Sequence, residues 1–224
     1  MTERAARVAV VAADRPQTVG EEIANSLSHG LGLLLALASL PVLVWQADRL
    51  GGAADIVAAS IFASTMIVLY GVSTLYHALP QGAAKHWLQR LDHAAIYLFI
   101  AGSYTPFTLG VLGGPWGWSL FGVVWAAAAF GVTVKLLNRL RHPWLSTGLY
   151  VAMGWVALVA APLLVDRLPA AGLAWLVAGG LSYTLGAAVF LLDNRVRYAH
   201  AVWHLFVLAG TLCHVVAALL YAHG

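Results

Sequence analysis

The 224-residue sequence predicts an all-α fold, a seven-transmembrane helix bundle. Two features of the chain carry this prediction. Hydrophobic residues make up 61% of the sequence and charged residues only 9%, whereas roughly 25% of residues are charged in soluble domains. The charged residues are also clustered, so that long stretches of the chain contain none.

The stretches without Asp, Glu, Lys or Arg define the helices. They cover residues 23–47, 56–84, 93–134, 142–165, 168–192 and 198–224. About 20 residues of helix cross the hydrocarbon core of a bilayer, so five stretches hold one helix each. The third stretch has room for two, and Gly113-Gly114-Pro115-Trp116-Gly117 in its middle favours a turn. We therefore expect a short cytoplasmic tail over residues 1–20 and a seven-helix membrane domain over residues 21–224.

Composition argues against several other classes of protein. The apolar stretches are continuous, whereas the strands of a membrane barrel alternate apolar and polar residues. Cys213 is the only cysteine, so the chain cannot be a disulfide scaffold. The net charge of +3 comes from separated clusters, and we expect no nucleic-acid partner because such proteins gather basic residues on one face.

The distribution of basic residues predicts the orientation. Only Arg49 and Arg167 fall on the far side of a seven-helix arrangement. The other basic residues fall in the tail or in loops on the side of the tail: Arg4, Arg7, Arg15, Lys85, Arg90, Lys135, Arg139, Arg141, Arg195 and Arg197. Because Lys and Arg concentrate in cytoplasmic loops, we predict a cytoplasmic N-terminus and a C-terminus outside.

A few polar side chains remain inside the predicted helices, where ionisable groups are rare and usually functional. Ser73 and His77 are four residues apart, near the end of the second helix, and share one face. Asp92 begins the third helix. His200 and His204, also four apart, begin the seventh. In the predicted orientation these side chains all lie at one depth, near the cytoplasmic surface.

These residue types together predict a zinc site. Catalytic zinc typically has three protein ligands and one open position. His200 and His204 can contact one metal ion from a single helix, and His77 would complete the set. Asp92 would orient a ligand or accept a proton from water, and Ser73 would hydrogen-bond to the water or to Asp92. The alternative is that each histidine only hydrogen-bonds to a neighbouring helix, as buried polar groups generally do.

Other polar residues allow more than one interpretation. Glu22, Asn25 and His29 share one face of the first helix, where they either line the entrance to the site or cap and pack the helix. His214 lies nearer the middle of the membrane, and we expect it to make a buried hydrogen bond. His93 lies near a loop, where solvation at the membrane interface is expected.

The motifs that contain these residues resemble those of a known family. They are Glu22-x-x-Asn25-x-x-x-His29-Gly30, STLYHA at 73–78, LDHAAIYLFIAGSYTPF at 91–107 and HAVWHLFVLAGTLCH at 200–214. From about residue 20 onward, the chain closely resembles the bacterial hemolysin III proteins of the progestin and adipoQ receptor family. The resemblance implies a multi-pass protein of the bacterial inner (plasma) membrane with a cytoplasmic N-terminus.

The same resemblance implies a site and an activity. The zinc-binding histidines of the adiponectin receptors match His77, His200 and His204, and the family's motif serine and aspartate match Ser73 and Asp92. A ceramidase-like activity is attributed to those receptors, which implies a membrane lipid as substrate or ligand. Partners that dock on the long N-terminal tail of the eukaryotic receptors are not expected here, because the tail of this chain is short, and other protein partners stay unknown.

Three functions follow as hypotheses. The first is a zinc-dependent hydrolase that cleaves a lipid amide or ester, or a related factor in membrane-lipid homeostasis. The second is a non-catalytic sensor of lipids or fluidity with structural zinc. The third is a hemolysin-type pore, although the sequence shows no polar stripe running through the bundle.

Overall fold

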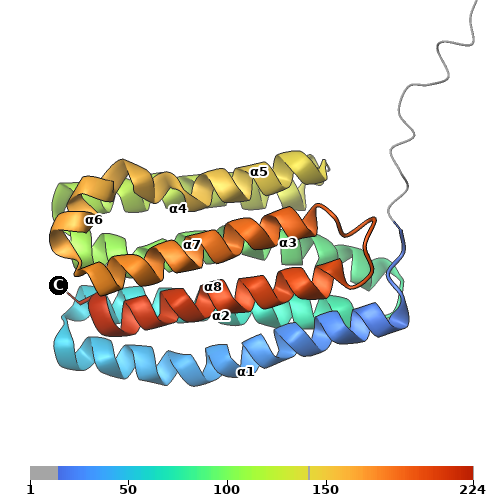
Figure 1. Ribbon diagram of the computed structural model, residues 1–224, viewed down its shortest axis with the longest axis horizontal. Helices are drawn as coiled ribbons and strands as arrows, with labels where there is room; N and C mark the ends of the chain where they lie inside the picture. Colours follow the sequence, from blue (N-terminus) through green and yellow to red (C-terminus); the bar gives the residue numbers. More distant parts are fainter. Residues whose placement is uncertain (1–14, 141, 224) are drawn as a thin grey trace, which may run out of the picture.

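The computed structural model describes residues 15–140 and 142–223, and this part of the chain is helical with no strands. The elements in chain order are α1 (Val19–Leu50), α2 (Ala53–Ala78), α3 (Ala83–Thr105), η1 (Pro106–Leu112), α4 (Gly114–Leu136), α5 (Pro143–Gly154), η2 (Val156–Ala160), α6 (Ala161–Arg167), α7 (Ala170–Phe190) and α8 (Ala199–Tyr221) (Figure 1). Most of the expected tail, with Arg4 and Arg7, lies outside the described residues, as does Arg141.

Seven helical segments of the described chain are long and apolar enough to cross a membrane. They are α1, α2, α3 with η1, α4, α5 through α6, α7 and α8. The all-α, seven-helix prediction is therefore confirmed. The start of α1 and the end of α8 lie at opposite ends of the bundle (Figure 1). Which end faces the cytoplasm stays a prediction.

The glycine-rich turn separates two helices where it was expected. Gly113 and Gly114 have φ values of 50° and 51°, in the left-handed region that glycine adopts most readily. The preceding segment, from Pro106, is a π-helix, and α4 begins at Gly114. The turn thus reverses the chain in the middle of its longest apolar stretch.

The fifth span is interrupted, and α3 stabilises the interruption. The α-helix ends at Gly154 and resumes as α6 only after the 3₁₀ turn η2. The hydroxyl of Tyr104 in α3 donates to the carbonyls of Met153 and Gly154 (3.1 and 2.6 Å) and accepts from the backbone N–H of Ala157 (2.9 Å). Backbone groups freed within a membrane span need such partners.

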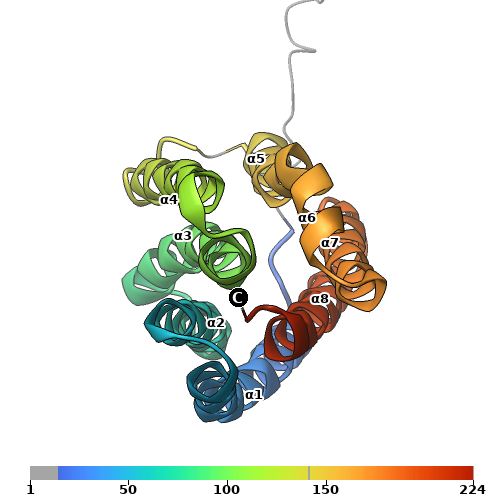
Figure 2. The same cartoon turned by 90° about the vertical axis from the view of Figure 1, so that its left-hand side faces the viewer.

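Seen from one end, the helices form a ring (Figure 2). Helix α1 packs against α2 and α8, α7 packs against α8, and α3 lies between α2 and α4. The buried core includes Phe62, Met66 and Tyr70 of α2. Large apolar side chains such as Leu34 and Phe130 are exposed on the outer faces, as expected for surfaces in contact with lipid.

Candidate metal centre

Three histidines from two helices converge at the end of the bundle where α1 begins. His77 is on the last turn of α2, and His200 and His204 are on the first two turns of α8. One ring nitrogen of each lies within 4.8 Å of those of the other two, so the cluster could hold a metal ion. All three side chains are buried. The predicted triad is therefore brought together from positions more than a hundred residues apart in sequence.

Helix α1 fixes the ring of His77. The Nδ1 atom of His77 donates to Oε2 of Glu22 (2.7 Å), whose other oxygen forms an ion pair with Lys85 (2.8 Å). The ammonium group of Lys85 also donates to the carbonyls of Tyr76 and Leu79, at the end of α2 (both 3.0 Å). Glu22, which is partly buried and lines the cavity as one of its two expected roles requires, thus also orients a triad member through a hydrogen bond that was not expected.

The other two rings are held in the same manner. Nδ1 of His200 donates to Oδ2 of Asp193, in the loop before α8 (2.9 Å). Nδ1 of His204 lies 3.2 Å from the carbonyl of Asn25 and 3.0 Å from the hydroxyl of Ser28. In all three histidines, Nδ1 therefore contacts a partner outside the triad.

The remaining ring nitrogens decide whether a metal fits. Nε2 of His77, of His200 and of His204 is buried without a hydrogen-bond partner in the described part of the chain. Leaving three buried nitrogens unsatisfied is costly. Metal-binding histidines bind through one nitrogen and donate the other N–H to a carboxylate or carbonyl. The triad fits a divalent metal ion on this criterion.

The remaining predicted residues lie beside the triad. Ser73 contacts Nδ1 of His29 at 2.7 Å, and the His29 ring stacks on His204 with centroids 3.4 Å apart. Asp92 is buried, interacts with Ser73 and lies within electrostatic range of His200. Nε2 of His29 is also buried without a partner in the described chain. His29 therefore packs beside the triad without being one of the three histidines whose nitrogens lie within 4.8 Å of one another.

A large cavity begins at the candidate metal centre. Its volume is about 1550 Å³, and Asp92, His29 and His200 line it at this end. It continues between α3, α5, α7 and α8 to Leu112 and Leu164 near the opposite end of the bundle. Pockets for drug-sized ligands measure about 300–1,000 Å³, so this space accommodates a longer molecule.

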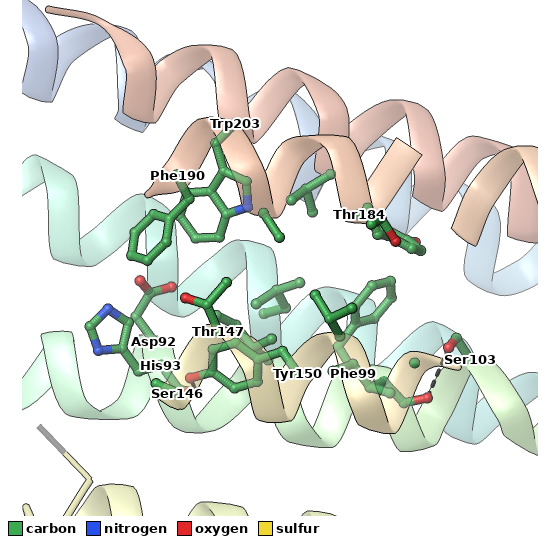
Figure 3. Close-up of a pocket in the computed structure, with 18 of the residues that line it drawn as sticks. Asp92, His93, Phe99, Ser103, Ser146, Thr147, Tyr150, Thr184, Phe190 and Trp203 are labelled. Atoms are coloured by element: carbon green, nitrogen blue, oxygen red, sulfur yellow. Dashed lines mark hydrogen bonds between the residues drawn. The ribbon is translucent and has the colours of Figure 1, made fainter. Parts of the chain in front are cut away.

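The cavity wall near Asp92 carries polar groups (Figure 3). His93 is partly exposed and lines the cavity, and its solvation at the membrane interface stays a prediction. Ser146 and Thr147 of α5 are buried. The Ser146 hydroxyl interacts with Tyr97 and Tyr150, whereas that of Thr147 has no hydrogen-bond partner in the described chain. Further along, His214 also lines the cavity and packs edge-on against Tyr183 of α7.

Two residues that hold His200 in place, Asp193 and Gln17, could not be predicted from the sequence. Asp193 lies in the loop between α7 and α8, seven residues before His200. Gln17 precedes α1 and donates to both oxygens of Asp193. Neither lies in a recognisable motif, and both contacts depend on tertiary packing. The hydrophobic pattern therefore carried no signal for them.

The chain is thus a multi-pass helical membrane protein with a buried histidine cluster that could bind a metal. The chain matches the family described as Haemolysin-III related over residues 17–215. It belongs to this family, and the resemblance noted from its motifs is confirmed.

Curated relatives match over nearly the full length. Hemolysin-3 of Bacillus cereus is 39% identical over 221 residues, covering 99% of this chain and 97% of that protein. The Hemolysin-3 homolog of Bacillus subtilis (strain 168) is 40% identical over 204 residues, or 91% and 95% of the two chains. Monocyte to macrophage differentiation factor of Homo sapiens is 27% identical over 215 residues, or 92% and 86%. No solved structure gives a significant match.

Proposed function

We propose that this protein is a zinc-dependent hydrolase that cleaves an amide or ester bond of a membrane lipid in the bacterial inner membrane. The supporting observation is the set of three buried histidines with free Nε2 atoms at one end of a long cavity. Imidazole nitrogen is a preferred ligand of zinc, and three protein ligands with an open position are typical of catalytic zinc. The Bacillus relatives support the bacterial membrane location.

In this proposal the protein's own side chains handle the proton. Zinc, when bound, supplies Lewis-acid activation of water and of the scissile carbonyl. Asp92 accepts the proton released by the attacking water and passes it to the leaving group. Ser73 holds the carboxylate of Asp92 in place, while Glu22 and Asp193 keep the proton of His77 and His200 on Nδ1.

The shape of the cavity supports a lipid substrate. Apolar side chains such as Phe99, Leu176 and Val207 line its length and suit a hydrocarbon chain. The polar wall near Asp92, with the hydroxyls of Ser146 and Thr147, suits the polar end of the same molecule. A lipid in this position would present its carbonyl to the histidine cluster.

The test measures both lipid hydrolysis and bound zinc in the wild-type protein and in an Asp92→Asn variant. Purified protein in lipid nanodiscs is incubated with a panel of lipid amides and esters, and fatty acid release is measured. We expect Asp92→Asn to slow release by about 10²–10⁴-fold, the range typical for loss of an acid–base group, while zinc stays bound. Release at the wild-type rate by the Asp92→Asn protein would contradict the proposal.

One observation favours the sensor hypothesis as a second candidate. Nε2 of His29 is buried without a hydrogen-bond partner in the described chain, and its ring stacks on His204 beside the triad. A fourth protein ligand would close the coordination sphere, as in structural zinc sites. Loss of zinc in a His29→Ala variant would favour a structural site, and retention would favour the open, catalytic one. For the hemolysin-type pore, reproducible conductance of the pure protein in bilayers is the corresponding test.

A further inference from the structure

The segment before α1 contacts the candidate metal centre through one side chain, Gln17. Its Nε2 atom donates to both carboxylate oxygens of Asp193 (3.0 and 3.2 Å), and its Oε1 atom accepts from Nδ2 of Asn25 (2.7 Å). An amide side chain can donate at one end and accept at the other. Gln17 therefore joins the loop before α8 to helix α1 across 176 residues of sequence.

Both partners of Gln17 hold rings of the histidine triad. Asp193 accepts from Nδ1 of His200, and the backbone carbonyl of Asn25 accepts from Nδ1 of His204. The path from Gln17 to His200 consists of two hydrogen bonds through a single carboxylate. Asp193 lies outside the regular helices, in the connection between α7 and α8, so its side chain needs a second contact to keep one position.

The segment that carries Gln17 is itself anchored. The guanidinium group of Arg15 pairs with Glu21, which is fully buried and also accepts from the backbone N–H groups of Thr18 and Tyr198 (both 2.9 Å). The hydrogen bond from Arg15 lowers the pKa of Glu21, so the carboxylate stays ionised and the pair persists at neutral pH. These contacts tie the segment to α1 and to the residue before α8.

The same segment covers the cavity at the metal end. Arg15, Pro16 and Gln17 line the cavity together with His200. Figure 2 shows the segment before α1 crossing the far end of the space that the helices enclose. It therefore lies across the end of the cavity where the histidines gather.

We propose that residues 15–18 form part of the metal centre and that Gln17 is a positioning residue for His200, acting through Asp193. The inference rests on the proposed zinc site. Partners that orient metal-binding histidines typically contribute 10–100-fold to metal affinity. Gln17 fixes such a partner, so its removal leaves Asp193 free to rotate away from His200.

The test measures zinc affinity of the full-length protein by competition with a chelator. Gln17→Met keeps the side-chain size but removes the hydrogen bonds to Asp193 and Asn25, and we expect it to weaken zinc binding by about 10–100-fold. Gln81→Ala is the matched control, because Gln81 is exposed and also lines the cavity. It should bind zinc as tightly as the wild type. If Gln17→Met protein is not recovered folded, Gln17→Asn, one methylene shorter, replaces it.

Two further readouts separate positioning from a general loss of structure. The visible absorption of the Co²⁺-loaded protein should change in Gln17→Met, because it reports the ligand geometry, while metal-free thermal stability stays at the wild-type value. In an Asp193→Ala background, Gln17→Met should cost little additional affinity, since residues that act through one another are non-additive. If Gln17→Met weakens zinc binding by the same factor with and without Asp193→Ala, Gln17 does not act through Asp193.

The two proposals fail in different ways. A wild-type protein that binds no zinc would overturn the zinc centre and this inference together. A wild type that binds zinc, with unchanged affinity and unchanged Co²⁺ absorption in Gln17→Met, would overturn this inference alone.

Discussion

In each histidine of the triad, Nδ1 contacts a partner outside the triad and Nε2 does not. The Nε2 atoms therefore determine what the triad can bind. His77 donates from Nδ1 to a carboxylate of α1, and His200 donates from Nδ1 to the carboxylate before α8. These bonds fix the tautomer, because a neutral imidazole carries one N–H only. The Nε2 atoms are therefore left as electron-pair donors that face the same buried space.

Metal binding should depend on pH, because protons and zinc compete for the same nitrogen atoms. Imidazole coordinates only in its neutral form, and a free histidine has a pKa of about 6.5. Zinc affinity is therefore expected to be highest above this range and to fall as the pH falls through it. Equilibrium dialysis against zinc buffers between about pH 7.5 and pH 4 measures this. Zinc content that stays constant down to about pH 4 would argue against imidazole ligands.

Some residues of the candidate site could be predicted from the sequence and others could not. His200 and His204, four apart on one helix, and Asp92 on another were recognisable because ionisable groups are conspicuous in apolar segments. The expectation that Asp92 begins its helix was wrong, because α3 begins at Ala83. Asp193 was not recognisable, since a carboxylate in a polar loop is unremarkable until tertiary packing brings it to His200. Gln17 could not be predicted for the same reason, because its contact with Asp193 depends on tertiary packing.

At the scale of elements, small residues set how closely the helices approach. Gly172, Gly179 and Gly186 recur every seven residues on α7 and are buried, and a Cβ atom at each would meet side chains of α8. Close backbone approach at small residues is a common way for helices to associate in membranes. The pairing of α7 with α8 holds the start of α8, and thus His200, against the cavity.

The contact between α2 and α3 gives a direct test of this packing. A Cβ atom at Gly102 would overlap the side chain of Thr65, whereas a Cβ atom at Gly122 of α4 meets nothing within 4 Å. We expect Gly102→Ala to destabilise the protein by about 1–3 kcal/mol, as overpacking typically does. Gly122→Ala should be neutral or stabilise by up to about 1 kcal/mol, because alanine favours helix. Denaturation in detergent measures both, and equal stabilities would contradict the close approach.

At the scale of the whole molecule, charge and hydropathy were sufficient to predict seven helices in one bundle. The described structure agrees, and the glycine-rich turn separates the third and fourth spans as expected. The break in the fifth span was not foreseen. It depends on Tyr104 of another helix, which binds the backbone groups that the break exposes. No local pattern in the fifth span encodes that contact.

The orientation of the bundle follows from the asymmetry of its basic residues and can be tested with reporters. A periplasmic alkaline phosphatase fused after His223 should be active, and one fused after Gln81 should be inactive, because the two positions lie at opposite ends of the bundle. A fluorescent protein that matures only in the cytoplasm should give the reverse pattern. Activity of the phosphatase at Gln81 and not at His223 would show that the N-terminus is outside.

If three imidazoles from α2 and α8 hold one zinc ion, as we propose, the zinc content of the purified protein, measured by mass spectrometry, depends on them. We expect about one zinc ion per chain in the wild type and in His214→Ala, a control histidine on the same helix, because a single triad holds a single ion. The His200→Ala and His204→Ala double variant should be purified essentially without zinc. Wild-type zinc content in that double variant would show that these imidazoles do not hold the ion.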